Sequence, residues 1–362
     1  MMQKHMKAQL VYDGIDIKIP ESMGTPKANQ MQGTPLEQLG ELACRVCYDS
    51  LGVGRPSSEL HKHILDVDNT SVYEHCVFTV RFYISDKQSK FLRNFINRKG
   101  IWIDVKPYYI DITVNFRAVL EWDKWSSETN KGFLNDFVEK TLWSYAHDLA
   151  PQIFRLLANP IFTNYTTELV TENLNEDQAH ISMWLYGSRG FTHEQVRHRF
   201  AMSQRSTRYV DENESEYIEH PLITAFLTDK TANNEDKEFM RNYIDAAIAA
   251  DRRAYVDITK SLEAYKLEHG LSKTDARKQA RGAARGNLGN ALASEMIFTA
   301  SVSGWKWMLQ KRASKFADAE IRAVYTDVLP ELKRSQYGFM FEDYNLIPSP
   351  DGIGMVLNEF QS

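Results

Sequence analysis

The sequence predicts an α+β fold, because long helical patterns and half-buried strand patterns occupy separate stretches of the chain. Apolar and polar residues alternate over 76–83, with β-branched and aromatic side chains, which is typical of a strand with one buried face. Residues 234–269 instead place apolar side chains on one broad helical face, and Gly270 follows as a stop signal. With 362 residues and 43% hydrophobic content, the chain can bury a sizeable core.

Two segments precede the clear strand. Residues 20–36 are rich in Pro, Gly and polar side chains, so we expect a loop or a mobile arm there. Residues 36–48 have the apolar spacing of a helix and include Cys44 and Cys47 in one CxxC. A zinc site would need further ligands, and a thioredoxin-like site its own strand-to-helix context, so we expect two thiols packed in the fold. An odd total of three cysteines fits a reducing compartment better than a disulfide framework.

A stretch of about a hundred residues, 84–183, follows the strand. It contains helical pieces such as 91–97 and 151–157 and a second strand-like run at 108–122. Its residues indicate no chemistry. Because such a long segment carries secondary structure of its own, we expect it to fold with the core instead of forming a linker.

The C-terminal part of the chain is expected to be helical. A helical pair is predicted at 274–293 and 294–315, before a tail that contains Pro330, Pro348 and Pro350. Trp305 and Trp307 lie at helical spacing with other large apolar side chains, which favours a core position for both.

Composition excludes several classes of protein. The 43 basic and 48 acidic residues give a net charge of −5, so no global cationic field attracts nucleic acid or anionic lipid. No apolar run approaches the roughly 18 residues that a membrane-spanning helix needs, and the first residues lack the apolar stretch of a signal peptide. We therefore expect a cytoplasmic protein with no membrane or nucleic-acid partner.

Positive charge is concentrated in one short segment of this acidic chain. Residues 189–208 contain a single acid, Glu194, against five arginines: Arg189, Arg197, Arg199, Arg205 and Arg208. Such crowding is tolerable where anions share the charge, and the planar guanidinium group suits phosphates and the carbonyl edge of a pyrimidine. His193 and His198 add further donors.

Short polar side chains are interleaved with these arginines: Ser203, Gln204, Ser206 and Thr207. The combination predicts a local nucleotide-binding site. The alternative interpretation is a solvated basic helix face, salt-bridged to the acids Asp211, Glu212 and Glu214.

The segment 197–209, RHRFAMSQRSTRY, resembles the signature of flavin-dependent thymidylate synthases. In that signature, RHR is followed by a serine, then an arginine and an aromatic residue. The matching residues are Arg197, His198, Arg199, Ser206, Arg208 and Tyr209. Six residues separate Arg199 from Ser206, one fewer than in the usual pattern. Tyr209 is expected to contact the ligand.

Two further blocks resemble the family in the same order. Upstream, SVYEHCVFT carries Ser71 at the place of a hydroxyl residue that contacts the flavin. Downstream, the block that runs from ARGNLG to AEIR places Arg285 at a dUMP-binding arginine and Arg312 at the essential arginine that binds and polarises the uracil. The resemblance covers about 36–82 and 184–331.

The resemblance implies the following site residues. For dUMP they are Glu194, Gln195, Arg197, Gln204, Arg205, Ser206, Arg208, Arg285 and the catalytic Arg312. For FAD they are Ser71, Arg197, His198, Arg199, Ser301, Ser303 and Trp307. Ser301 and Ser303 stand where the family carries an Asn-Ala-Arg run, and Trp307 stands at a flavin-contacting Asn or His. Glu194 stands at a dUMP-binding position where the family commonly has a glutamine. The alternative is that the neighbouring Gln195 takes over this role. No metal is implied.

The resemblance also implies the reaction and the assembly. The reaction is the reductive methylation of dUMP to dTMP, with methylenetetrahydrofolate as carbon donor and NADPH-reduced FAD as hydride source. Members are homotetramers with sites shared between subunits, built on a mixed, mainly antiparallel sheet with flanking long helices. The expected segments are an N-terminal arm, 1–35; two parts of the catalytic core, 36–83 and 184–335; an inserted α/β segment packed on the core, 84–183; and a C-terminal tail, 336–362.

Two alternative functions stay open at this point. One is a related flavin-dependent enzyme on the same fold that hydroxymethylates or reduces a pyrimidine nucleotide. The other is a non-catalytic nucleic-acid-binding protein that uses the arginines as a phosphate clamp. Three residues have simpler interpretations: Glu74 and His75 as a satisfied polar pair beside the strand, and Glu320 as a structural acid.

Overall fold

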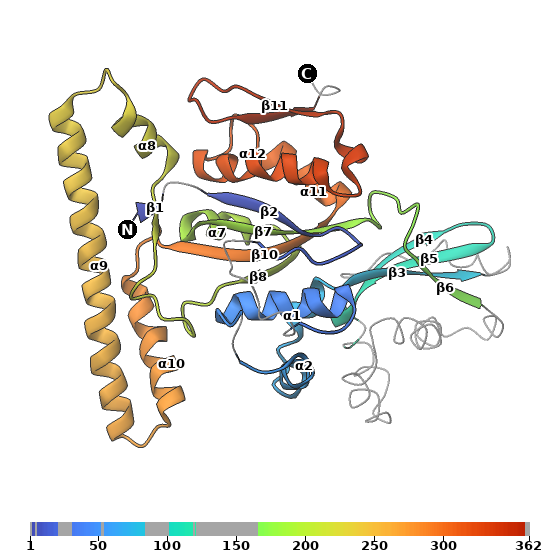
Figure 1. The fold of residues 1–362 in the computed structure, drawn as a ribbon, viewed down its shortest axis with the longest axis horizontal. Helices are drawn as coiled ribbons and strands as arrows, with labels where there is room; N and C mark the ends of the chain where they lie inside the picture. Colours follow the sequence, from blue (N-terminus) through green and yellow to red (C-terminus); the bar gives the residue numbers. More distant parts are fainter. Residues whose placement is uncertain are drawn as a thin grey trace.

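The computed structural model describes part of the chain, namely residues 2–3, 6–20, 31–51, 54–83, 101–118, 120 and 166–358. Within these residues, antiparallel sheets are combined with helices, which confirms the predicted α+β class (Figure 1). The helical pieces predicted at 91–97 and 151–157, and most of the loop predicted at 20–36, lie outside the described residues.

A four-stranded antiparallel sheet forms the centre of the molecule, in the order β2-β7-β10-β8. Its strands are β2 (Lys7–Tyr12), β7 (His180–Ser188), β10 (Ala293–Ser301) and β8 (Ala201–Gln204). Helix α1 (Pro35–Tyr48) covers one face, and α11 (Val302–Arg312) and α12 (Ala319–Arg334) cover the other (Figure 1). Successive residues of β7 therefore enter different cores, Met183 toward α11 and α12 and Trp184 toward α1.

The predicted helix at 294–315 is wrong over its first half, because residues 293–301 form β10. This strand lies between β7 and β8 and is buried on both faces, with Met296 and Phe298 in one core and Ile297 in the other. A strand buried on both faces loses the polar alternation that marks a strand in the sequence. Only the second half of the predicted element is helical, as α11.

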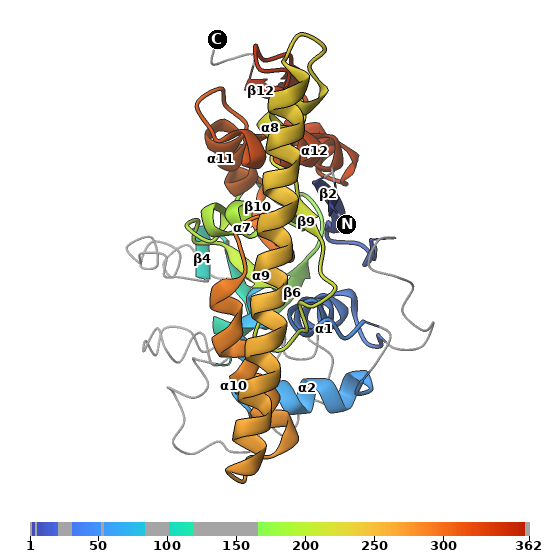
Figure 2. The ribbon, with the colours of Figure 1, turned by 90° about the vertical axis from the view of Figure 1, so that its left-hand side faces the viewer.

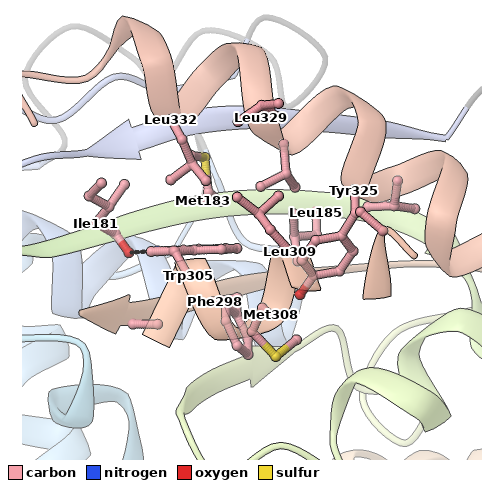
Figure 3. Packing of buried hydrophobic residues seen from close by; sticks show 14 of the residues in the cluster. Ile181, Met183, Leu185, Phe298, Trp305, Met308, Leu309, Tyr325, Leu329 and Leu332 are labelled. Atoms are coloured by element: carbon pink, nitrogen blue, oxygen red, sulfur yellow. Dashed lines mark hydrogen bonds between the residues drawn. The ribbon is translucent and has the colours of Figure 1, made fainter. Parts of the chain in front are cut away.

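Helices α11 and α12 pack on β7 through a dense apolar cluster (Figure 3). Trp305 is fully buried there, as predicted, and its indole N–H donates to the carbonyl of Ile181 over 3.0 Å. Pro330 was expected in a tail but lies inside α12. Burial of the apolar face of this helix stabilises it by more than the loss of the one backbone hydrogen bond that proline cannot make. Glu320 accepts bonds from the backbone N–H and the hydroxyl of Ser188, a structural role as expected.

A second four-stranded sheet, also antiparallel, has the order β4-β5-β3-β6. The clear strand of the sequence is β3 (Val77–Tyr83), and its partners are β4 (Ile101–Val105), β5 (Tyr109–Asn115) and β6 (Thr166–Val170). An ion pair between Arg81 and Asp111, 2.8 Å apart, joins β3 to β5. The described strands β4, β5 and β6 thus share one sheet with β3, whereas β7, which begins at His180, belongs to the central sheet.

Helix α1 begins with a capping box between Thr34 and Glu37 and continues to Tyr48, as predicted. Cys44 is buried in the core and Cys47 is partly buried, so both thiols pack within the fold. Helix α2 (Ser57–Asp66) and the 3-10 helix η2 (Thr70–Glu74) connect α1 to β3.

A long helical hairpin stands along one side of the molecule (Figure 2). It consists of α9 (Asn234–Glu268), which confirms the predicted long helix, and α10 (Lys273–Ala284). Gly270 adopts φ +82° in the turn between them, a backbone region that suits glycine. Helix α10 is shorter than the predicted 274–293, because the chain turns through η3 (Arg285–Asn287) before it enters β10. Tyr255 is the one buried side chain of α9.

Small elements complete the described part of the fold. They are β1 (Met2–Gln3) paired in parallel with β9 (Tyr217–Ile218), α7 (Arg189–Gln195), α8 (Pro221–Thr228), η4 (Gly338–Phe341), and the hairpin of β11 (Tyr344–Ile347) and β12 (Met355–Asn358). None of the helices in these described ranges has the length and apolar character needed to cross a membrane.

Candidate functional site

The arginine segment, residues 189–208, is helical only over its first seven residues. Helix α7 begins after its N-cap Ser188 and ends at Gln195, and residues 196–200 then lead into β8. Arg197 and Arg199 are exposed on this connection. Arg205 does approach Glu212, at 3.6 Å, but Asp211 pairs with Arg281 instead. The alternative of a salt-bridged basic helix face is therefore wrong for this segment.

A cavity of about 920 Å³ lies between the two sheets, against the connection from α7 to β8. Five of the seven residues expected at the flavin line it, namely His198, Arg199, Ser301, Ser303 and Trp307. They come from two places that are a hundred residues apart in the chain, the RHR segment and the start of α11. Antiparallel pairing of β8 with β10 holds these two places side by side.

Two residues expected at the flavin do not line this cavity. Arg197 is exposed one residue before His198, and Ser71 is exposed on η2, whose last residue Glu74 does reach the cavity. The two serines of α11 already have local partners. Ser301 caps the helix by accepting from the Gly304 N–H at 3.2 Å, and the Ser303 hydroxyl donates to Asp177.

Trp307 was predicted to lie in the core, and this is wrong. Its side chain is 42% exposed and forms part of the cavity wall, whereas Trp305, two residues earlier, is fully buried. The two indoles lie on different faces of α11, because side chains two residues apart point in directions that differ by about 200° around a helix. The Trp307 ring contacts His198 edge to face, with centroids 5.1 Å apart.

Arg312 contacts His198 and Glu194 through its guanidinium group. Its Nε donates to His198 Nε2 over 2.7 Å, and its Nη1 donates to Glu194 Oε2 over 2.8 Å. Burial lowers the pKa of His198 to about 4, and the positive charges of Arg312 and Arg197 act in the same direction. A neutral ring that accepts at Nε2 carries its proton on Nδ1, so the imidazole can donate toward a ligand.

Glu194 and Gln195, the two residues that compete for one family position, point to different places. The Gln195 side chain is buried, and its Oε1 accepts from the Tyr325 hydroxyl at 3.1 Å. Glu194 is partly exposed and contacts the guanidinium of Arg312. The side of α7 that faces Arg312 therefore presents a carboxylate, where the resemblance had implied that an amide is common.

The remaining residues expected at dUMP lie along the far end of β8 and beyond it. Gln204 donates to the hydroxyls of Thr192, at 2.9 Å, and Ser294, at 3.2 Å. Arg205 approaches Asp49 as well as Glu212, and it lines a separate cavity of about 510 Å³. The backbone N–H of Ser206 donates to the carbonyl of Cys47.

Arg208 and Arg285 lie near the helical hairpin. Arg208 packs beside Gly282 of α10, and Arg285 is exposed where α10 ends. In the described part of the chain, neither has an acidic side chain within salt-bridge distance. Tyr209 is 38% exposed and contacts Tyr48, with ring centroids 4.8 Å apart. One chain thus keeps these residues apart from the lining of the 920 Å³ cavity.

The sequence did not reveal a buried polar network that reaches the cavity at Thr299. His75 is buried, its Nδ1 lies 2.8 Å from Oγ1 of Thr299, and its Nε2 lies 3.0 Å from Oγ of Ser203. Glu74 pairs with Arg117 instead, at 2.6 Å, so both side chains are satisfied but not by each other. Burial lowers the pKa of His75 to about 3, which keeps the ring neutral between its two hydroxyl partners.

Trp102 and Asn115 were also missed, although they line the cavity from β4 and β5. The strand-like run at 108–122 was recognised, but its pairing with a neighbouring strand at 101–105 was not. A short alternating run next to a turn at 106–108 is the signal that would have found it.

Comparison with known proteins identifies the family. Residues 176–335 match the family model described as thymidylate synthase complementing protein. The chain is 37% identical to a flavin-dependent thymidylate synthase of Corynebacterium efficiens over 186 residues, which is 51% of this chain and 69% of that protein. It is 36% identical to the enzyme of that name from Mycolicibacterium gilvum over 178 residues, 49% of this chain and 66% of the relative.

The chain spans about two thirds of the length of these curated relatives. The family match begins just before β7 and ends with α12, so it contains the arginine segment, Arg285 and Arg312 but neither Ser71 nor Trp102. By this similarity, and as its arginine segment predicted, the chain belongs to the family of flavin-dependent thymidylate synthases.

Proposed function

We propose that this chain catalyses the reductive methylation of dUMP to dTMP, with methylenetetrahydrofolate as the carbon donor and NADPH-reduced FAD as the hydride source. The observation that carries the proposal is the cavity in which the RHR segment meets the start of α11. Its volume of about 920 Å³ lies in the range of ligand and cofactor sites.

The lining of this cavity fits a flavin. Trp307 offers an exposed indole to a planar ring, Arg199 offers a cation for a phosphate, and His198 carries a donor proton on Nδ1. A bound flavin would supply the hydride chemistry, because cofactors perform steps that side chains cannot. His198, Arg199, Ser301, Ser303 and Trp307 would hold it, with Arg197 and Ser71 completing the site.

Arg312 is the residue to which we assign catalysis. Three of its contacts, to His198 Nε2 and to the carboxylate and carbonyl of Glu194, fix the plane of the guanidinium. Two of its five N–H groups are left for a substrate. A fixed cation of this kind stabilises negative charge that develops on a pyrimidine ring. Binding of dUMP further involves Glu194, Gln195, Arg197, Gln204, Arg205, Ser206, Arg208 and Arg285.

The three cysteines support a mechanism without an enzyme thiolate. Burial raises the pKa of Cys44 to about 12 and that of Cys47 to about 11, and it raises the pKa of Cys76 further still. A thiol with so high a pKa is protonated at neutral pH and is a poor nucleophile. None of the three cysteines forms a disulfide in the described part of the chain, which fits the reducing cytosol, where we place the reaction.

A homotetramer explains why one chain keeps its dUMP residues apart. Arg208 and Arg285 lie at the helical hairpin, whereas Arg312 and Glu194 lie beside the cavity. Sites assembled from several chains would bring the two groups together. Helix α9 leaves large side chains such as Phe239 and Tyr243 exposed, 72% and 70%, which suits burial against a neighbouring subunit.

The product decides the proposal. Flavin-loaded protein is incubated with dUMP, methylenetetrahydrofolate and NADPH, and the nucleotide is identified by mass. We expect dTMP, and none when the Arg312→Ala variant is used. A hydroxymethylated or reduced nucleotide would instead favour a related enzyme on the same fold. Colourless protein that binds nucleic acid with a steep salt dependence would mean that no flavin enzyme is present.

A further inference from the structure

The cavity has a second wall that the family match does not contain. Trp102 lies on β4, and Thr113 and Asn115 lie on β5, all before residue 176, where the match begins. The opposite wall, from His198 to Met202 and from Thr299 to Trp307, lies inside the match. The second sheet therefore adds residues to this site that membership of the family does not assign.

Each wall presents one tryptophan to the cavity. Trp102 is 41% exposed and Trp307 is 42% exposed, whereas Trp184 and Trp305 in the cores are 3% and 0% exposed. An indole is a large apolar group that is usually buried when the fold can bury it. Two indoles left partly open in the same cavity indicate a ligand with an aromatic surface.

The position of Trp102 follows from the pleat of β4. Its neighbours Ile103 and Val105 pack against the core under α1, so the alternate residues Trp102 and Asp104 face the other way. Trp102 is paired in register with Thr113, which also lines the cavity. The hairpin that carries it is therefore anchored in the sheet.

Two ion pairs fix this wall, one within the second sheet and one to η2. Arg81 of β3 binds Asp111 of β5 at 2.8 Å, and the Arg81 guanidinium also lies 4.0 Å from the centre of the Tyr109 ring. Arg117, just after β5, binds Glu74, which lines the cavity. The wall is thus tied to the strand that precedes it and to η2.

We infer that Trp102 is a ring-binding residue of this cavity, which receives a planar heteroaromatic ring between the wall that carries Trp102 and the wall that carries Trp307. The inference rests on the proposed function, which supplies two candidate rings. These are the isoalloxazine of the flavin and the pterin of the folate. Stacking on an indole, together with the area that it buries, amounts to about a tenfold change in affinity.

The test measures binding before activity. The full-length chain is freed of flavin and titrated with FAD while the flavin fluorescence is followed, and then the flavin-loaded protein is titrated with methylenetetrahydrofolate. Trp102→Ala is expected to raise one of the two dissociation constants about tenfold, and Trp102→Phe, which keeps a ring, is expected to restore most of the affinity. The ligand whose affinity falls is the source of the ring.

The matched control is Tyr108→Ala, in the turn of the same hairpin. Tyr108 is 70% exposed and does not line the cavity, so both ligands should bind this variant as they bind the wild type. Equal affinities of wild type and Trp102→Ala for both ligands would overturn the inference and leave the proposed function intact. A wild-type chain that binds neither ligand would overturn both. Circular dichroism of each variant shows whether the sheet is intact.

Discussion

Arg312 and His198 form a hydrogen bond in which the guanidinium donates from Nε to Nε2 of the imidazole, 2.7 Å away. An imidazole that accepts from a cation is neutral, and burial keeps it so by lowering its pKa to about 4. The same guanidinium also binds the Glu194 carboxylate. Arg312 therefore contacts a charged partner and a neutral imidazole at the same time. The candidate catalytic arginine is thereby coupled to the wall of the 920 Å³ cavity, which His198 lines.

The Glu194 carboxylate compensates the charge of Arg312, and we expect this to weaken the attraction of the guanidinium for dUMP. We expect Glu194→Gln to tighten dUMP binding by about three- to tenfold, because no carboxylate then compensates the charge of the guanidinium, while the amide oxygen can still accept a hydrogen bond from it. The measurement is a titration of flavin-loaded protein with dUMP, followed by the flavin absorbance. The control is Glu176→Gln, which breaks the ion pair with Lys306, a residue of α11 like Arg312. This variant should leave the affinity for dUMP unchanged. Weaker dUMP binding in Glu194→Gln would show that the carboxylate orients Arg312 productively.

Three buried histidines make the free energy of unfolding depend on pH. Burial lowers the pKa of His61 to about 4, of His75 to about 3 and of His198 to about 4, from an ordinary value near 6.5. The unfolded chain therefore binds more protons than the folded chain below pH 6.5, and stability is lost as the pH falls toward 4. We expect the urea midpoint to be lower at pH 5 than at pH 7.

The matched variants for this pH effect are His75→Gln and His193→Gln. His75→Gln lowers the midpoint at pH 7, since it disturbs the bonds to Thr299 and Ser203, but it should reduce the loss between pH 7 and pH 5. His193 is exposed, so its replacement should leave the pH dependence as it is. If His75→Gln keeps the wild-type dependence, then His75 does not contribute to it.

Trp305 and Trp307 are expected to separate stability from flavin binding. Trp305→Ala removes a fully buried indole and its hydrogen bond to Ile181 and should cost about 3–5 kcal/mol of unfolding free energy. Trp307→Ala should cost about 1 kcal/mol or less, because the ring is 42% exposed, yet it should weaken FAD binding severalfold. Urea unfolding at one fixed protein concentration and a FAD titration measure the two effects. Similar losses of stability in both variants would contradict this division.

Assembly is the last expectation. Light scattering should give a mass about four times the 41.8 kDa of the chain. Phe239 and Tyr243 stack on each other one turn apart on the open face of α9, with centroids 6.2 Å apart. Replacing both with serine should lower the mass and the activity together, whereas Lys260→Ser on the same helix should change neither. An active chain that stays monomeric at micromolar concentration is incompatible with shared sites.

Local signals in the sequence were sufficient for several elements and for the family. The strand β3, the helices α1 and α9 and the arginine segment are each encoded within one stretch, by periodicity, end signals and side-chain type. The family resemblance rests on the same kind of local information, and the family membership that it predicted is confirmed.

Tertiary packing decided what periodicity cannot express. Residues 293–301 became a strand because two neighbouring strands enclose them, and of Trp305 and Trp307 only the first entered the core because α11 has one buried face. His75 meets Ser203 and Thr299, which are 128 and 224 residues away in the chain. The sequence alone thus determined several local elements and the family, and it predicted which residues could hold an anionic nucleotide and a flavin. The fold determined which of them share a cavity, because contacts between distant residues depend on how the sheets and helices pack.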